Sequence, residues 1–350
     1  MELVHGGDWA GYHAEFGVDA LDFSANVSPL GLPEGVAAAI TAALPTADRY
    51  PDPLCRALRE KLAQAEGVPT EHILCGNGAA DLIFRLVLAL HPRRALLPAP
   101  TFAEYAAALQ TVNCTITYSV LDEAADFAVT DAFVDAVGQD TDVVFLCQPN
   151  NPTGRITPPA LVEKLLQRCA ANGAVLAVDE CFLDFAAGRE ALTAKAFLQE
   201  YPNLILFKAF TKLYAMAGVR LGYALCSNTA LLEKMRAAGQ PWAVSALAQA
   251  AGTAALDEAA YADAVRALVA QQRPVLTSGL RALGLRVIEG SANFLLFCAP
   301  ADLGQKLRQR GAVVRSCGNY PGLDATWYRA AVRTEAENRQ LLRLIKEVLE

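Results

Sequence analysis

Short apolar runs alternate with longer amphipathic segments between residues 71 and 226, a pattern typical of strands and helices laid into one sheet. Seven strands are predicted, over residues 73–75, 95–97, 115–120, 143–147, 175–178, 204–207 and 221–226. Between them, apolar residues recur every three or four positions, which predicts helices over 79–90, 102–109, 131–137 and 158–171. The pattern therefore predicts an α/β fold with a mostly parallel central sheet flanked by helices.

The pattern changes after Ser245. Ala-rich helices are predicted over 246–270 and 272–283, followed by short strands at 286–288, 294–297, 313–315 and 328–332 and a charged amphipathic helix over 335–349. The N-terminal segment through Pro33 shows little periodicity and is expected to be loop-rich and to dock on the rest of the chain. We predict a large domain at 46–245 and a smaller α+β domain formed by 1–45 plus 246–350.

Composition and charge narrow the classes of function. The 350 residues carry 30 Lys plus Arg against 37 Asp plus Glu, a net charge of −7, which argues against a partner that is a nucleic acid or an anionic membrane. Nine cysteines occur without a C-x-x-C pair, so we expect reduced thiols and no metal site. We find no signal-peptide pattern and no run of about 18 apolar residues. These features predict an ordered, cytoplasmic protein.

The strongest chemical signal is Lys212, which follows the predicted strand 204–207 and is flanked by apolar residues. A lysine after a strand is often only a solvated loop residue. Apolar surroundings disfavour the ammonium form, however, and leave an amine that can act as a nucleophile in a Schiff base. Arg220 lies eight positions on, far enough to return a guanidinium to the same pocket and bind a phosphate.

Three more segments fit the same pocket. The glycine-lined start of a helix at 76–81 could cradle a phosphate with backbone N–H groups, although such a turn is often only a tight turn. The turn 148–154 lies at the carboxyl end of a predicted strand, where open α/β sheets bind ligands, and its alternative is an ordinary loop. Asp179 ends another strand, and its carboxylate could meet a cationic ring nitrogen or cap a helix.

Together these motifs resemble the fold-type I pyridoxal-phosphate enzymes of the aminotransferase class I/II family, over nearly the whole chain. The resemblance implies a fold-type I PLP-dependent transferase in which residues 46–245 bind pyridoxal 5'-phosphate. It also implies that Lys212 forms the Schiff base with the cofactor and that Asp179 pairs with the pyridine nitrogen. The other implied cofactor contacts are Arg220 with the backbone of Gly78, Ala79 and Ala80 at the phosphate, Asn151 at the 3′ oxygen, Phe102 on the ring, and Tyr50.

The resemblance also implies a homodimer, because Tyr50 matches a tyrosine that family members lend to the partner subunit's cofactor phosphate. Arg329 matches the arginine that holds the substrate's α-carboxylate. The chain departs from the family at two positions. Phe182 replaces a tyrosine that usually contacts the 3′ oxygen, and Ala209 replaces a hydroxyl residue that often contacts the phosphate. Neither position carries the covalent link, so cofactor binding is still expected.

The cofactor motifs do not name the reaction, because pyridoxal chemistry can labilise any of three bonds at the α-carbon. Segments 5–7, 22–31 and 331–338 resemble the threonine-phosphate decarboxylase branch of cobalamin biosynthesis, a relative of the histidinol-phosphate aminotransferases. A phosphorylated amino acid needs at least two groups that hold anions. The expected substrate contacts are Arg329, Arg333, Arg315, His5 and Asn26. Surface charges and a disordered terminus are the alternatives for Arg315, Arg333 and His5.

We therefore predict PLP-dependent decarboxylation of L-threonine O-3-phosphate, or of serine phosphate, to an amino-alcohol phosphate. The alternative is an aminotransferase of the histidinol-phosphate type, which shares every cofactor contact. A catalytically silent pyridoxal-phosphate sensor is disfavoured, because Lys212, Asp179, Asn151 and Arg220 occur together. A nucleotide-binding Rossmann protein is set aside, because no G-x-G-x-x-G run is present.

Overall fold

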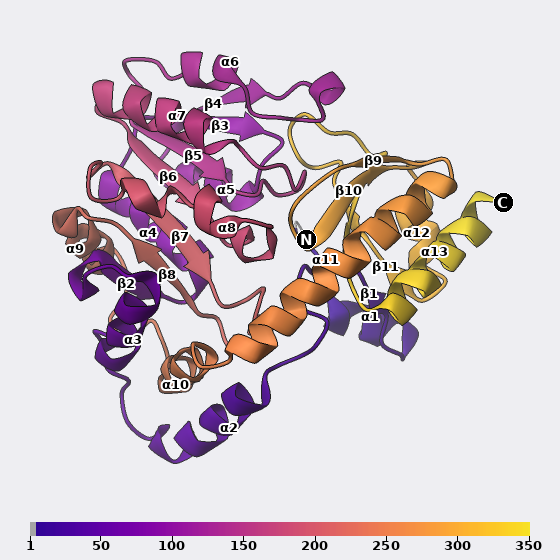
Figure 1. Cartoon of the computed structure of the whole chain (residues 1–350), viewed down its shortest axis with the longest axis horizontal. Coiled ribbons are helices and arrows are strands. Elements are labelled where there is room, and N and C mark those ends of the chain that lie inside the picture. The colour runs from indigo at the N-terminus through magenta and orange to yellow at the C-terminus, as the bar shows by residue number, and fades with distance from the viewer. Residues whose placement is uncertain (1–4) are drawn as a thin grey trace.

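The computed structural model describes residues 5–350 and has a seven-stranded sheet at its centre (Figure 1). The strand order is β2-β8-β7-β6-β5-β3-β4. These strands are β2 (Ile73–Gly76), β3 (Arg94–Ala99), β4 (Thr115–Val120), β5 (Val143–Cys147), β6 (Val175–Asp179), β7 (Leu204–Ala209) and β8 (Gly222–Leu225). Neighbouring strands run parallel except β8, which is antiparallel to both β2 and β7. The predicted α/β fold with a mostly parallel sheet is confirmed.

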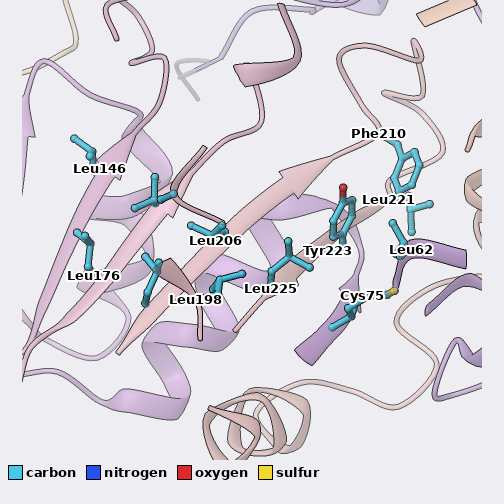
Figure 2. Close-up of a cluster of buried hydrophobic side chains, with 14 of the residues drawn as sticks. Leu62, Cys75, Leu146, Leu176, Leu198, Leu206, Phe210, Leu221, Tyr223 and Leu225 are labelled. Atoms are coloured by element: carbon cyan, nitrogen blue, oxygen red, sulfur yellow. The ribbon is translucent and has the colours of Figure 1, made fainter. Parts of the chain in front are cut away.

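Helices cover both faces of this sheet and bury its apolar strands. The helices of this part are α3 (Arg56–Glu66), α4 (Gly78–Leu90), α5 (Ala103–Gln110), α6 (Asp131–Asp135), α7 (Pro159–Ala171), α8 (Arg189–Leu192) and α9 (Thr229–Ala237). Figure 2 shows one face, where Leu146, Leu176 and Leu206 from three adjacent strands lie in one buried cluster. Alternate residues such as Phe145 and Ala177 enter the core on the other face. Burial on both faces explains why most of these strands read as unbroken apolar runs; the edge strand β4 is the exception and is largely exposed.

The smaller part contains a four-stranded sheet of order β12-β13-β10-β9. Its strands are β9 (Arg286–Ile288), β10 (Phe294–Cys298), β12 (Arg315–Ser316) and β13 (Trp327–Ala331), and the helices of the C-terminal part are α11 (Ala259–Ala282), α12 (Leu303–Arg308) and α13 (Glu335–Leu349). β1 (Leu21–Asp22) pairs in parallel with β11 (Ala312–Val313), so the N-terminal segment docks on the C-terminal part, as expected.

Two local predictions were wrong, and one short helix in the loop-rich N-terminal segment was missed. The Ala-rich stretch breaks after α10 (Ala246–Ala255), and α11 then runs unbroken through Pro274, because Val269, Leu276 and other residues buried along it offset the hydrogen bond that a proline removes. The predicted strand 313–315 is divided between β11 and β12, which belong to different sheets. The N-terminal segment contains α1 (Trp9–Phe16), whose one buried residue, Tyr12, leaves too little apolar periodicity to reveal a helix.

The helices α2 (Glu34–Ala43) and α10 pack together and contribute Val36, Ala248 and Ala251 to the core of the large sheet. The boundaries predicted from sequence place both helices with the smaller domain; those boundaries remain a prediction, and residues 1–4 lie outside the described range. Within residues 5–350, no helix combines the length and the apolar character that crossing a membrane requires.

Candidate active site

Lys212 lies in the loop that joins β7 to β8, and its side chain is half-buried. Its Nζ is 5.4 Å from the centre of the Phe182 ring, and its backbone carbonyl accepts a hydrogen bond of 2.9 Å from the amide of Ser28. Burial, followed by the positive charge of Arg329, lowers the pKa of Lys212 to about 8. The amine can therefore be neutral near physiological pH, as a nucleophile requires.

Arg220, at the other end of the same loop, lies against the N-terminus of α4. A Cβ on Gly78, which has a φ of +84°, would come within 2.7 Å of Nη2 of Arg220, and a Cβ on Gly222 would come within 2.6 Å of the amide nitrogen of Ala79. Only glycines allow this close approach. A guanidinium beside the positive end of a helix forms a cradle that suits an anion, as the sequence predicts for a phosphate group.

Asp179 ends β6 beside the last residue of β5, and its carboxylate is buried. One oxygen, Oδ1, accepts a hydrogen bond of 3.0 Å from the amide of Cys181. The other, Oδ2, accepts one of 2.8 Å from the hydroxyl of Tyr105. The predicted ring-nitrogen partner is therefore an oriented carboxylate at the carboxyl edge of the sheet.

Arg329 reaches this edge from β13 of the smaller part, and it is buried. Its Nη2 donates to the carbonyl of Ser24 at 2.9 Å, and its Nη1 donates to Oδ1 of Asn151. With the Asn26 amide oriented to satisfy its neighbours, its oxygen accepts from Nε of Arg329 at 3.1 Å. Two segments distant in sequence, 24–26 and the turn at Asn151, thus fix one guanidinium. Because Arg329 and Arg220 both lower the pKa of Lys212, the three cations share one site.

Phe102 and His5 lie at the edge of this site. Phe102 immediately precedes α5, and its ring centre is 6.1 Å from that of His5. Nε2 of His5 is 2.5 Å from a carboxylate oxygen of Glu104, and the amide of Gly7 donates to Oγ of Ser24 at 2.8 Å. These contacts hold the start of the described chain near Phe102 and the Arg329 site.

The two remaining predicted anion holders differ in their surroundings. Arg315 and His5 line the same cavity of about 320 Å³, and Nη2 of Arg315 donates to Oδ1 of Asn319 at 2.8 Å. The guanidinium of Arg333 donates to Glu337 at 2.6 and 2.9 Å, so a carboxylate already compensates its charge. A substrate role for either arginine remains a prediction.

Tyr50 is not brought to the site of its own chain. Its side chain is 79% exposed and stacks on Trp242, with ring centres 4.5 Å apart. This exposure leaves the hydroxyl available to a second subunit, and the assignment to a partner's site remains a prediction. The sequence analysis did not identify Tyr105, because an aromatic residue three positions after Phe102 on a helix resembles a core residue.

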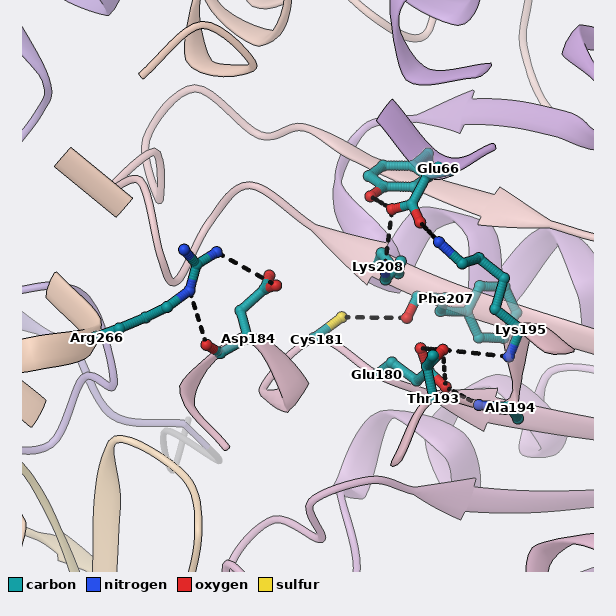
Figure 3. A network of polar contacts seen from close by, with 11 residues as sticks. Glu66, Glu180, Cys181, Asp184, Thr193, Ala194, Lys195, Phe207, Lys208 and Arg266 are labelled. Carbon is teal, nitrogen blue, oxygen red and sulfur yellow. Dashed lines mark hydrogen bonds and ion pairs between the residues drawn. The ribbon is translucent and has the colours of Figure 1, made fainter. Parts of the chain in front are cut away.

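A buried ionic cluster lies at the base of the Lys212 loop (Figure 3). Glu66, the last residue of α3, accepts hydrogen bonds from Lys208 at 2.8 Å, Lys195 at 2.9 Å and the Tyr223 hydroxyl at 2.5 Å. Lys208 and Tyr223 are cross-strand partners on β7 and β8, directly below the loop. Burial works to raise the pKa of Glu66, but Lys208 and these hydrogen bonds outweigh it and lower the pKa to about 2.

Comparison with known proteins gives a consistent picture. A family model described as aminotransferase class I and II matches residues 18–345. The threonine-phosphate decarboxylase of Salmonella typhimurium is 38% identical over 333 residues, which cover 94% of this chain and 91% of that protein. A histidinol-phosphate aminotransferase of Symbiobacterium thermophilum is 33% identical and covers 95% of this chain and 91% of its own length. The histidinol-phosphate aminotransferase structure from Clostridium acetobutylicum superposes with a TM-score of 0.88 at 27% identity, covering 94% of this chain and 98% of that one.

Proposed function

This chain belongs to the aminotransferase class I and II family of pyridoxal-phosphate-dependent enzymes, and we propose that it decarboxylates L-threonine O-3-phosphate, or serine phosphate, to an amino-alcohol phosphate. The observation that carries the choice is the 38% identity to the threonine-phosphate decarboxylase of Salmonella typhimurium over 94% of the chain. The resemblance of segments 5–7, 22–31 and 331–338 extends the proposal to a place in cobalamin biosynthesis. An aminotransferase of the histidinol-phosphate type is the second candidate, because such a relative is 33% identical.

The residues at the site fit the cofactor. Arg220 and the amides of Gly78, Ala79 and Ala80 would hold its phosphate, because the glycine at 78 leaves room for the guanidinium at the helix start. The remaining contacts would be Phe102 on the ring, Asn151 at the 3′ oxygen and Lys212 through its amine. When bound, the cofactor supplies an electron sink for the charge left at the α-carbon as a bond there breaks.

Arg329 would select the bond that breaks. Its guanidinium is buried and fixed by Asn151 and Ser24, so a carboxylate paired with it takes one defined orientation. Asp179 would keep a proton on the ring nitrogen. Lys212, with a pKa of about 8, is able to carry a proton at neutral pH and deliver it to the α-carbon after the carboxyl group leaves.

The substrate's phosphate needs a second anion holder. His5 and Arg315 are our candidates, because they line one cavity with Ser24, whose carbonyl accepts a hydrogen bond from Arg329. Arg333, which donates to the carbonyl of Asp22, and Asn26, beside Arg329, lie nearby. The segment 5–7 would exclude water from the reacting carbon. We also propose a homodimer, in which the exposed Tyr50 of each chain completes the phosphate site of the other.

The reaction is tested by incubating the holoenzyme with three substrates, namely threonine phosphate, serine phosphate, and histidinol phosphate with 2-oxoglutarate. Release of CO2 from a phospho-amino acid, without glutamate from histidinol phosphate, supports the decarboxylase. Glutamate formation without CO2 refutes it in favour of the aminotransferase. Lys212→Ala should abolish either reaction, whereas Lys164→Ala, which removes an exposed lysine on α7, should not.

A further inference from the structure

Tyr105 on α5 is fully buried and lies between two groups of the proposed cofactor site. Its hydroxyl donates a hydrogen bond of 2.8 Å to Oδ2 of Asp179. Its ring stacks on Phe145 of β5 at 4.8 Å with an interplanar angle of 14°, and meets the Phe102 ring edge-on at 5.5 Å and 84°. One side chain therefore contacts both the acid expected at the ring nitrogen and the aromatic residue expected on the ring face.

The direction of this hydrogen bond is fixed, with Tyr105 as the donor and Asp179 as the acceptor. Burial and the negative charge of Asp179 raise the pKa of Tyr105 well above its ordinary value, so the phenol remains a donor. The thiols of Cys147 and Cys181 also face this carboxylate, and burial raises the pKa of both. Lys212 lies close enough to interact electrostatically with the same carboxylate. Asp179 is thus an acceptor held among protonated groups.

The two carboxylate oxygens are each fixed by one donor from the protein, because Oδ1 accepts from the amide of Cys181. A carboxylate oxygen has two lone-pair sites, so each oxygen can accept one further bond. The carboxylate is consequently oriented without being saturated, which suits a group that must receive a pyridinium N–H.

Two other buried tyrosines, Tyr328 and Tyr12, contrast with this arrangement. The hydroxyl of Tyr328, in the core of the smaller part, donates to the backbone carbonyls of Pro300 and Ala301. The hydroxyl of Tyr12 donates to the backbone carbonyl of Arg308. Such bonds satisfy a buried hydroxyl and nothing more. The acceptor of Tyr105 is instead a side chain at the site.

We propose that Tyr105 is a positioning residue that fixes the Asp179 carboxylate against the cofactor's ring nitrogen and sets the Phe102 ring against the cofactor's face. The inference rests on the cofactor roles proposed for Asp179 and Phe102, and it does not depend on which substrate the enzyme takes.

The test is Tyr105→Phe, which keeps the stacked ring and removes only the hydroxyl. Tyr328→Phe is the matched control, since it also removes a buried hydroxyl. Two quantities are measured on the folded protein, as verified by circular dichroism: the dissociation constant of pyridoxal 5'-phosphate, and the pH midpoint of the bound cofactor's absorption change. The midpoint reports protonation of the nitrogen that joins Lys212 to the cofactor.

Tyr105→Phe should weaken cofactor binding by about tenfold, the effect of losing one hydrogen bond to a charged group. The midpoint should move upward. Without the phenol, the Asp179 carboxylate is held less firmly against the ring nitrogen. The pair that keeps the ring protonated then weakens, and the positive charge on the ring, which disfavours protonation of the linking nitrogen, falls. A packing defect alone would not shift this midpoint.

A double-mutant cycle with Asp179→Asn shows whether Tyr105 acts through Asp179. In the Asp179→Asn background, Tyr105→Phe should cause no further shift of the midpoint. The inference is overturned if Tyr105→Phe matches Tyr328→Phe in both measurements, or if its full effect persists in the Asp179→Asn background. If the substrate test refutes the proposed decarboxylation, the results of these cofactor measurements do not change. Failure of the proposed function and failure of this inference can therefore be told apart.

Discussion

Replacing Glu66 by glutamine should destabilise the fold that supports the Lys212 loop. Glu66 is 9% exposed and is the common acceptor for Lys208, Lys195 and Tyr223. Lowering the pKa of a carboxylate from its ordinary 4.5 to about 2 corresponds to about 3 kcal/mol of stabilisation. Glutamine cannot carry this charge, and it leaves Lys208 in the interior without its paired carboxylate, so we expect the free energy of unfolding to fall by about 3 kcal/mol at neutral pH.

The effect should depend on pH in a defined window. The pKa of Glu66 is lower in the folded protein than its ordinary value, so its contribution is complete above about pH 4.5 and is lost as the pH falls toward about 2. The stability difference between the wild type and Glu66→Gln should therefore narrow over this range. Urea-induced unfolding, followed by circular dichroism at a series of pH values with saturating cofactor, measures it.

Glu347→Gln is the matched control, because Glu347 forms an exposed pair with Arg343 at 3.9 Å. Such a pair contributes less than about 1 kcal/mol. The reasoning is refuted if Glu66→Gln lowers the free energy of unfolding no more than Glu347→Gln does, or if the difference between Glu66→Gln and the wild type stays constant from pH 7 to pH 3.

Three further predictions concern the site. Cofactor uptake by the apoprotein, followed by absorption, should accelerate as the pH rises through about 8, the pKa of Lys212. Arg329→Met should move the pH midpoint of this acceleration upward, because the positive charge of Arg329 lowers that pKa. A wild-type midpoint near 10.5 would contradict the proposal that neutral Lys212 attacks the cofactor. Gly78→Ala should weaken cofactor binding roughly tenfold or more, because its Cβ would come within 2.7 Å of the guanidinium of Arg220, which we propose holds the phosphate. Gly173→Ala, with a similar positive φ and open space around it, should not. Mixing inactive Tyr50→Ala and Lys212→Ala chains should restore activity if Tyr50 serves the partner's site, and absence of complementation would place its role within one chain.

The strands of the large sheet could be predicted within about two residues. For most of them, burial on both faces produces apolar runs that need no tertiary information, whereas the exposed edge strand β4 is recognised by its β-branched and aromatic residues. Neither the break before α11 nor the continuity of α11 through Pro274 could be predicted, because both depend on which residues the neighbouring elements bury. The same limit applies to the ionic cluster. Glu66 and Lys208 are 142 positions apart, and nothing local distinguishes either from a solvated surface charge.

Asn151 shows how the fold combines motifs that the sequence presents separately. Arg329, 178 positions away on the smaller part, donates to its side-chain oxygen. An amide has a separate donor and acceptor, so Asn151 can receive this bond and still donate to the cofactor's 3′ oxygen. Phe182 has no hydroxyl that could donate to that oxygen, so the hydrogen bond from Asn151 becomes more important for holding it. The residue that we expect to hold the cofactor therefore also orients the guanidinium expected to hold the substrate, and through it the two parts of the chain meet at the reacting carbon.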